Sequence, residues 1–574
     1  MSNETELNCL YKRINSSNED QLECLNDMYE QSRLTICLPT GAGKGHLMIT
    51  DLLNRILNSN ESIFAIATHR LMLNTQHMSD IIGDFLPTTG KIGYIFVGSI
   101  KFNSAFLENE IDIETDSTKK EKKRQKLIEF NSRLYDLNIS RDSIISSVIS
   151  SPQLNEKIKE HIAEGRKVVI ITTYHSLMKL GSIDIDTIYC DEAHILATNS
   201  QKEDAIFKKN FNLITSKNYY FFSATPKDLL GVSDDDTTDT FLMNNKDIFG
   251  DRIGITFATA VAKGYIVEPV IHLLRPSDFE VGVDEFGSLE DKVKFIQEAF
   301  YAHRDYMRER SAEPDKLGAK ILIKCSSVVD EMWPLFNMLV GTLPNVKICA
   351  GASVENAEGM NIQGKHSIDE RNIPKRDAYL KELQSLKDEE EAIVLHFDIL
   401  SEGINVAGFT GIMFLSGLML TITKILQNIG RTTRLHEIDR NRLMQKLISV
   451  NDCTLKSKTT WVKPCSAVII PYWDDKSHET KKLMATIIHD LRYQYDFNAR
   501  LEVNLGDDRG TAKGDEIPPN LTTDEIEKIH ETLLNEIEQE IEGIRVGRLE
   551  RYNAHIVDNL TEEDWFNNVL GTLI

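Results

Sequence analysis

The chain has 574 residues and a formal net charge of −23, which excludes a single hydrophobic core and a uniformly basic surface like that of an architectural nucleic-acid binder. Its hydrophobic content of 41% and charged content of 27% are ordinary for a globular protein. No apolar run approaches the length of a membrane span and no secretory signal is present, so we expect a cytosolic protein. The eight cysteines form no CxxC pair, which argues against structural zinc.

Short apolar segments alternate with longer helical stretches, a pattern typical of parallel sheets covered by helices on both faces. In the first half, the expected strands are 34–38, 63–68, 92–98, 168–173, 187–190 and 219–225. In the second half, they are 319–325, 346–351, 392–397, 411–417 and 466–472. We therefore expect two α/β lobes, residues 1–265 and 266–475, joined near Gly264 to Pro276.

Two regions lie outside this pattern. Residues 99–165 form a polar, helical-looking insertion whose basic run, 119–126, we interpret as a solvated face rather than a phosphate contact. Residues 476–574 are expected to form a smaller, mainly helical C-terminal appendage. Within it, the stretch 523–542 carries apolar residues at helical spacing, which predicts an amphipathic helix: Ile526, Ile529, Leu533, Ile537 and Ile541.

The stretch LPTGAGKGH, residues 38–46, resembles a phosphate-binding loop between a strand and a helix. In such loops backbone N–H groups cradle phosphates, a lysine reaches the outer phosphates, and a Ser or Thr hydroxyl binds Mg²⁺. Lys44 is the candidate phosphate ligand, but Gly45 offers no hydroxyl. A glycine-rich turn with a solvated lysine is the alternative interpretation.

The strand expected at 187–190 ends in the adjacent carboxylates Asp191 and Glu192. This placement suits a site in which Asp191 binds hydrated Mg²⁺ and Glu192 activates a water beside a phosphate. The next strand ends in the hydroxyl residues Ser223 and Thr225, which could relay the nucleotide state between the lobes.

In the second half, the segment QNIGRTTR (427–434) places Arg431 and Arg434 three residues apart, a spacing that predicts one face of a helix. Bidentate arginines stabilise the charge on a phosphoryl group during its transfer. Surface ion pairs are the alternative role for either arginine.

Seven such segments occur in order, and together they resemble the motifs of superfamily 2 helicases, most closely the motor of type III restriction enzymes and related DEAD/DEAH proteins. The resemblance covers roughly residues 15–475, and the ordered set is far more specific than any one segment. It implies two RecA-like lobes. The segments are PTGAGKG (39–45), ATHRLMLNTQ (67–76), ITTYHSL (171–177), DEAH (191–194), SAT (223–225), FDILSEGINV (397–406) and QNIGRTTR (427–434).

The resemblance also implies roles for individual residues. Gln21 matches the adenine-reading glutamine, Asp191 the metal ligand and Glu192 the residue that activates water. The residues that match the triphosphate loop are Thr40, Gly41, Ala42, Gly43, Lys44 and Gly45. The residues that match further nucleotide contacts are Gly403, Asn405, Gln427, Arg431 and Arg434.

Three residues match positions that grip a nucleic-acid backbone in this family: Thr68, Arg70 and Thr173. Each could instead cap the end of a strand. The negative net charge does not exclude nucleic acid, because salt screens charges over about 8–10 Å and a local basic groove then dominates. The restriction-type resemblance favours DNA over RNA.

We therefore expect an ATP-dependent nucleic-acid helicase or translocase that uses ATP and Mg²⁺. Gly45 is the main departure from the family, but Mg²⁺ keeps several waters and needs few protein ligands, so we expect slower hydrolysis rather than none. The alternative is a nucleotide-regulated clamp with little or no turnover. No paired carboxylates of a nuclease type are recognisable after Pro471, so cutting would need a nuclease or other partner subunit.

Overall fold

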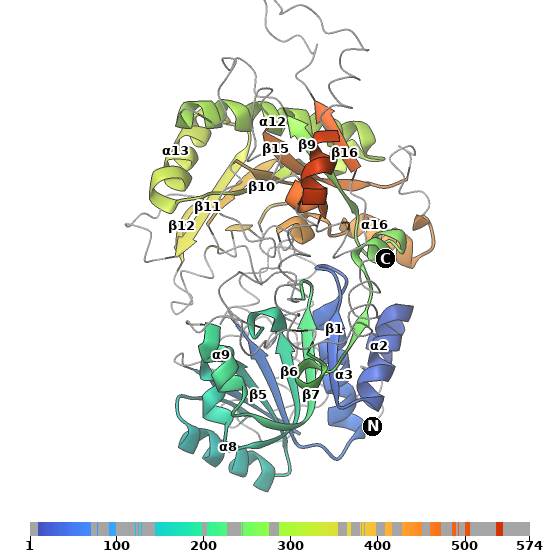
Figure 1. Cartoon of the computed structure of the whole chain (residues 1–574), viewed down its shortest axis with the longest axis vertical. Coiled ribbons are helices and arrows are strands. Elements are labelled where there is room, and N and C mark those ends of the chain that lie inside the picture. Colours follow the sequence, from blue (N-terminus) through green and yellow to red (C-terminus); the bar gives the residue numbers. More distant parts are fainter. Residues whose placement is uncertain are drawn as a thin grey trace, which may run out of the picture. The chain divides into compact units, whose positions relative to one another are not determined.

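A computed structural model shows two compact units, one mostly of residues 1–255 and the other mostly of residues 256–574 (Figure 1). The residues that the structure describes are 10–69, 91–98, 144–197, 204–226, 245–274, 288–353, 364–368, 385–397, 408–415, 428–450, 460–471, 485–489, 500–504 and 535–543, with single positions at 77, 121, 124, 128, 243, 286, 379, 382, 383 and 492.

The first unit is built on an eight-stranded sheet in the order β4-β3-β5-β2-β6-β7-β1-β8, with every neighbouring pair parallel. Its strands are β1 (Arg33–Cys37), β2 (Ile63–Thr68), β3 (Ile92–Val97), β4 (Ile145–Val148), β5 (Lys167–Thr173), β6 (Asp184–Asp191), β7 (Thr215–Ser223) and β8 (Asp251–Gly254). Its helices are α2 (Glu19–Glu30), α3 (Lys44–Asn58), α8 (Ser151–Ala163), α9 (Asp204–Phe211) and α10 (Lys246–Phe249), with the 3₁₀ turns η2 (Tyr174–Leu180) and η3 (Ala193–Ile195).

Both faces of this sheet are buried. Successive residues of a strand point to opposite faces, so each strand contributes to two cores. Phe64 and Ile66 of β2 pack in the core that α2 and α3 cover, whereas Ala65 and Ala67 pack in the core that α8, η2 and α9 cover. This burial on two sides explains why the strands are nearly continuous apolar runs.

The second unit repeats this architecture with the order β12-β11-β13-β10-β14-β15-β9-β16, again parallel throughout. Its strands are β9 (Glu268–Leu274), β10 (Lys320–Lys324), β11 (Lys347–Ser353), β12 (Lys365–Ile368), β13 (Ala392–His396), β14 (Gly411–Phe414), β15 (Cys465–Pro471) and β16 (Arg500–Asn504). Its helices are α11 (Phe257–Ala262), α12 (Leu289–Arg310), α13 (Trp333–Thr342) and α16 (Glu437–Met444), with the short turns η5 (Pro314–Lys316) and η6 (Val328–Met332).

All eleven strands expected from the sequence are present, and the prediction of two RecA-like lobes with parallel sheets is confirmed. Five further strands were not expected. Among them, β9 lies in the stretch where the lobes were expected to join, and β16 adds to the second sheet a strand from the region expected to be helical.

Parts of both outlying regions are described. The insertion contains β4 and α8, and the basic run is described only at positions 121 and 124. Residues 535–543 are helical, and Ile537 and Ile541 are buried as the expected amphipathic helix requires, while its earlier apolar positions lie outside the described residues. Among the helices that the structure describes, none combines the length and apolar character needed to cross a bilayer.

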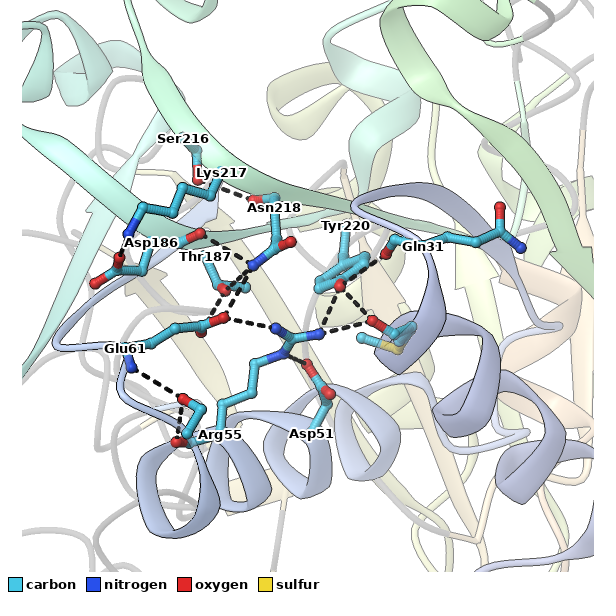
Figure 2. A network of polar contacts seen from close by, with 12 residues as sticks. Gln31, Asp51, Arg55, Glu61, Asp186, Thr187, Ser216, Lys217, Asn218 and Tyr220 are labelled. Atoms are coloured by element: carbon cyan, nitrogen blue, oxygen red, sulfur yellow. Dashed lines mark hydrogen bonds and ion pairs between the residues drawn. The ribbon is translucent and has the colours of Figure 1, made fainter.

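A buried polar network fixes the carboxyl-terminal half of α3 in the first unit (Figure 2). The Arg55 guanidinium donates to Asp51 Oδ2 at 2.9 Å, to the carbonyl of Met28 in α2 at 2.7 Å and to the Tyr220 hydroxyl of β7 at 2.6 Å. The Tyr189 hydroxyl of β6 also donates to Asp51 Oδ2, at 2.7 Å. One cation therefore holds α3 against α2 and, through the two tyrosines, against β6 and β7.

Candidate active site

The loop between β1 and α3 has the backbone that the phosphate-loop prediction requires. Gly41 and Gly43 have φ of 93° and 94°, a left-handed conformation that favours glycine. Gly43 is the N-cap of α3, and the helix has no side-chain cap at this end. The amino-terminal N–H groups of α3, with the positive end of the helix dipole, can thus receive an anion.

Gln21, near the start of α2, contacts this loop. Its Nε2 donates to the carbonyl of Ala42 at 3.0 Å, and its Oε1 accepts from the backbone of Asn18, also at 3.0 Å. The packing is close, because a Cβ at position 43 would lie 2.3 Å from Gln21 Nε2. Gln21 therefore lies beside the loop, as the resemblance implies, while its adenine-reading role stays a prediction.

Lys44 and Gly45 begin α3. The Lys44 amine donates to the carbonyl of Leu38 at 3.4 Å, so it reaches back over the loop toward the end of β1. A Cβ built at Gly45 meets no atom within 4 Å. The space beside Gly45, where the phosphate-loop pattern has a Ser or Thr side chain, is therefore not filled by another side chain.

Asp191 ends β6 and is held on both carboxylate oxygens. His77 Nε2 donates to its Oδ2 at 2.8 Å, and the backbone N–H of Glu192 donates to its Oδ1 at 3.0 Å. Burial opposes ionisation, but the hydrogen bond from His77 and the charge of Lys44 together lower the pKa of the Asp191 carboxyl below its ordinary value. A fixed, ionised carboxylate near a lysine suits a metal ligand beside a phosphate.

His77 is a site residue that the sequence did not indicate. It follows the segment ATHRLMLNTQ and is 5% exposed. A single histidine in such a run has no local feature that predicts its partner, which lies 114 residues further along the chain.

Glu192 adopts a left-handed backbone with φ of 51°, which is uncommon for a residue with a side chain. Its Oε2 lies 3.4 Å from His194 Nδ1, and the same ring nitrogen lies 3.2 Å from Ser223 Oγ. Ser223 Oγ in turn accepts the backbone N–H of Thr225 at 3.1 Å. The DEAH and SAT segments are therefore connected directly, as a relay of the nucleotide state would need.

Arg431 and Arg434 lie in the second unit, between β14 and β15. Residues 428–432 are helical, but Arg434 lies beyond the helix, so the prediction that both arginines share one helix face is wrong. The helix ends early because the carbonyls of residues 432–434 bind groups from other segments. Burial, with the like charge of Arg440, lowers the pKa of Arg434 to about 10, which leaves the guanidinium charged at neutral pH.

The two described residues of the expected nucleic-acid contact are neighbours. Thr68 ends β2 and Thr173 ends β5, and the strand register pairs them directly. Thr173 immediately precedes η2 and makes no side-chain cap to that turn. Both side chains are buried, and their contact with nucleic acid stays a prediction. Arg70, Gly403, Asn405 and Gln427 lie outside the described residues.

Residues 12–228 match a family model described as "Type III restriction enzyme, res subunit". A search of curated proteins finds no match. Among solved structures, an ATP-dependent Type ISP restriction-modification enzyme, LlaBIII, bound to DNA, is similar with a TM-score of 0.53 at 14% identity, covering 93% of this chain and 33% of that chain.

Two further structures are similar at lower scores. A nuclease-deletion mutant of the Type ISP enzyme LlaGI, in complex with a DNA substrate mimic, has a TM-score of 0.49 at 13% identity, covering 85% of this chain and 30% of that chain. S. cerevisiae Dbp5 bound to RNA and ADP BeF3 has a TM-score of 0.47 at 13% identity, covering 92% of this chain and 97% of that chain.

The chain spans about a third of the length of the Type ISP enzymes that it matches. The LlaBIII match is a likeness of fold, and it extends over both units. Residues 12–228 therefore resemble the type III restriction enzyme res subunit, and the chain as a whole has a fold of two RecA-like lobes.

Proposed function

We propose that this protein is an ATP-driven nucleic-acid helicase or translocase with DNA as its favoured track. The observation that carries the proposal is the arrangement at the amino end of α3. There, the glycine loop and Lys44 follow β1, and Asp191, held by His77, ends β6 in the same parallel sheet, so these groups come together at the carboxyl edge of that sheet. The match of residues 12–228 to the res-subunit family supports DNA over RNA.

The residues fit a Mg²⁺–nucleotide. Mg²⁺ prefers oxygen ligands, keeps several waters and is commonly held by one or two carboxylates together with the substrate's phosphates. Asp191 offers such a carboxylate, and the open space at Gly45 leaves room for a water in place of the missing hydroxyl. When bound, the metal would supply positive charge that polarises the phosphoryl oxygens.

The chain's own groups have separate tasks in this proposal. Backbone N–H groups of the loop and the Lys44 amine bind the phosphates, while His77 and the Glu192 N–H keep Asp191 oriented. Glu192 positions the attacking water and takes up its proton. Arg431 and Arg434 supply charge that stabilises the transferring phosphoryl group. The Glu192–His194–Ser223 contacts pass the state of the site to the end of β7.

A steady-state ATPase assay with Mg²⁺, with and without single- and double-stranded DNA and RNA, tests the proposal. We expect turnover that one nucleic acid stimulates and that Lys44→Ala abolishes. Lys167→Ala is the matched control, because the Lys167 amine donates to the Ser59 carbonyl at 2.7 Å, at the other end of α3. Loss of turnover in both variants, or equal turnover in the natural protein and Lys44→Ala, would refute the assignment of the loop.

Gly45 favours a second candidate, a nucleotide-gated clamp that binds nucleic acid without repeated hydrolysis. The same assay separates the two functions, because a clamp binds ATP without multiple turnovers. Recovery of turnover in Gly45→Thr, with none in the natural protein, would establish the clamp. A cytosolic location and a partner nuclease subunit also belong to the proposal and rest on the sequence alone.

A further inference from the structure

In the arginine segment, residues 428–434, three successive carbonyl groups, those of residues 432–434, lie at the end of the short helix 428–432, and each accepts a hydrogen bond from another part of the second unit. The Lys463 amine donates to the carbonyl of Thr432 at 2.5 Å and to that of Arg434 at 2.7 Å. Between them, the carbonyl of Thr433 accepts the backbone N–H of Val267 at 2.7 Å. The backbone of residues 432–434, next to Arg431 and including Arg434, is therefore held by a hydrogen bond at every carbonyl.

The end of a helix is where such bonds matter most. The last carbonyls of a helix have no partner within it and carry the negative end of the dipole, so a lysine there satisfies both the hydrogen bonds and the charge. Lys463 does this from a position that is 1% exposed. Because Thr432 O and Arg434 O bind the same amine, they cannot separate without breaking one of its bonds.

A buried carboxylate, that of Asp439, fixes the backbone of Lys463. Asp439, in α16, accepts the backbone N–H of Val462 on one oxygen and that of Lys463 on the other, both at 2.8 Å. The loop before β15 is thus fixed to α16, and the amine extends from it to the arginine segment. The Thr432 hydroxyl adds a bond to the carbonyl of Ile429 at 2.8 Å.

Burying an amine in this way is costly. Desolvation, with the like charges of Lys320 and Arg434, lowers the pKa of Lys463 to about 7, although Cys465 and Asp439 oppose the shift. The two bonds do not depend on the charge, because a neutral amine keeps two N–H donors. Buried apolar residues often stabilise a fold as well as buried ions do, so stability alone does not account for this lysine.

We infer that Lys463 is a positioning residue for ATP hydrolysis, which holds the backbone of Arg431 and Arg434 in the geometry that the transferring phosphoryl group requires. The inference rests on the proposed function, in which these arginines bind the γ-phosphate. Lys463 does not touch the nucleotide in this scheme and acts only through the arginine segment. Its removal leaves both guanidinium groups present but takes away two of the hydrogen bonds that hold their backbone.

The test compares Lys463→Met with Lys365→Met. Both lysines are buried, but Lys365 lies in β12, at the edge of the second sheet far from β15, with its amine over the Trp333 ring, and so serves as a control. We expect Lys463→Met to lower kcat by roughly 10- to 100-fold with little change in KM, as for a misplaced catalytic group. Lys365→Met should keep kcat close to that of the natural protein.

A double-mutant cycle separates positioning from general damage. If Lys463 acts through Arg434, Lys463→Met should cause little further loss in an Arg434→Ala background, whereas independent effects would multiply. An unchanged kcat in Lys463→Met, or full multiplication in the double variant, would overturn the inference. Should Lys463→Met fail to fold, Asp439→Asn, which weakens the hold on the Val462–Lys463 backbone, takes its place in the same cycle.

Amide hydrogen exchange over residues 428–436 provides a readout that does not need turnover. We expect faster exchange there in Lys463→Met and not in Lys365→Met. If the natural protein does not hydrolyse ATP, the proposed function fails, yet the exchange comparison still decides whether Lys463 holds the segment. Equal exchange in the natural protein and Lys463→Met would overturn the inference in either case.

Discussion

The substitution Gly45→Ser tests whether the missing hydroxyl limits turnover. Gly45 is the second residue of α3, and a Cβ built there meets no atom within 4 Å. A serine therefore fits without moving a neighbour, and helices favour it over glycine by roughly 0.5 kcal/mol. We expect the variant to fold at least as well as the natural protein, so that any change in activity is chemical.

The size of the effect follows from what the hydroxyl would replace. In the proposed site a water occupies the space beside Gly45, and holding one ordered water costs about 0–2 kcal/mol. A hydroxyl carried by the helix removes much of that cost, and about 1.4 kcal/mol corresponds to a tenfold change in affinity. We expect the Mg²⁺ concentration for half-maximal turnover to fall about tenfold, and by no more than about 30-fold.

The assay is ATP turnover as a function of Mg²⁺ concentration, at saturating ATP and nucleic acid, for the natural protein, Gly45→Ser and Gly45→Ala. Alanine occupies the same open space and stiffens the helix but offers no oxygen. A lower Mg²⁺ requirement in Gly45→Ser alone would support the reasoning. An equal change in Gly45→Ala would assign the effect to stiffness, and no change in either variant would place the metal away from Gly45.

Three other predictions concern the buried polar groups. Arg55→Met should lower the free energy of unfolding by about 3–5 kcal/mol in chemical denaturation, because it leaves the Asp51 carboxylate buried without its cation; a loss below about 1 kcal/mol would contradict this account. His77→Leu should raise the Mg²⁺ requirement for turnover by roughly 10- to 100-fold by releasing Asp191, and an unchanged requirement would exclude the orienting role. Burial depresses the pKa of Lys463 to about 7, so between about pH 7 and 10.5 the unfolded chain binds more protons than the folded protein. The free energy of unfolding of the natural protein, relative to that of Lys463→Met, should therefore rise with pH over this range. Chemical denaturation of both proteins at several pH values checks this, and a difference that falls with pH would refute it.

The features of the fold that could be predicted are those whose sequence signal lies within one short stretch of the chain. Strand β1 and the loop before α3 lie within one short stretch, and Asp191 follows directly on an apolar run. The strands that were missed are mostly short or atypical. Strand β8, for example, has the sequence Asp-Arg-Ile-Gly, which lacks an apolar pattern, and β9 contains Pro269.

The supporting residues of the site could not be predicted, because their partners are distant in sequence. His77 and Asp191 are 114 residues apart, and Lys463 lies 31 residues from Thr432. A lone histidine or lysine in an ordinary stretch carries no spacing that marks such a contact. The helical face expected for Arg431 and Arg434 was wrong for a related reason, since bonds from Val267 and Lys463 replace continued helix.

Burial of polar groups does not by itself distinguish the proposed machinery from the rest of the structure. The Arg55 network is also largely buried, but its cation is paired with Asp51 and Glu61, and Arg55 lies in the last turn of α3, away from the glycine loop. Two groups of the proposed machinery are held at a cost in free energy. Glu192 has a left-handed backbone, a strain of about 1–3 kcal/mol, and burial depresses the pKa of the Lys463 amine. Such a cost does not by itself identify a site, because burial also raises the pKa of Asp51 in the Arg55 network and Lys446 has a left-handed backbone with φ of 55°. The proposed machinery differs in what its groups do, since in the proposed mechanism Glu192 orients water and Lys463 orients arginine against a phosphate.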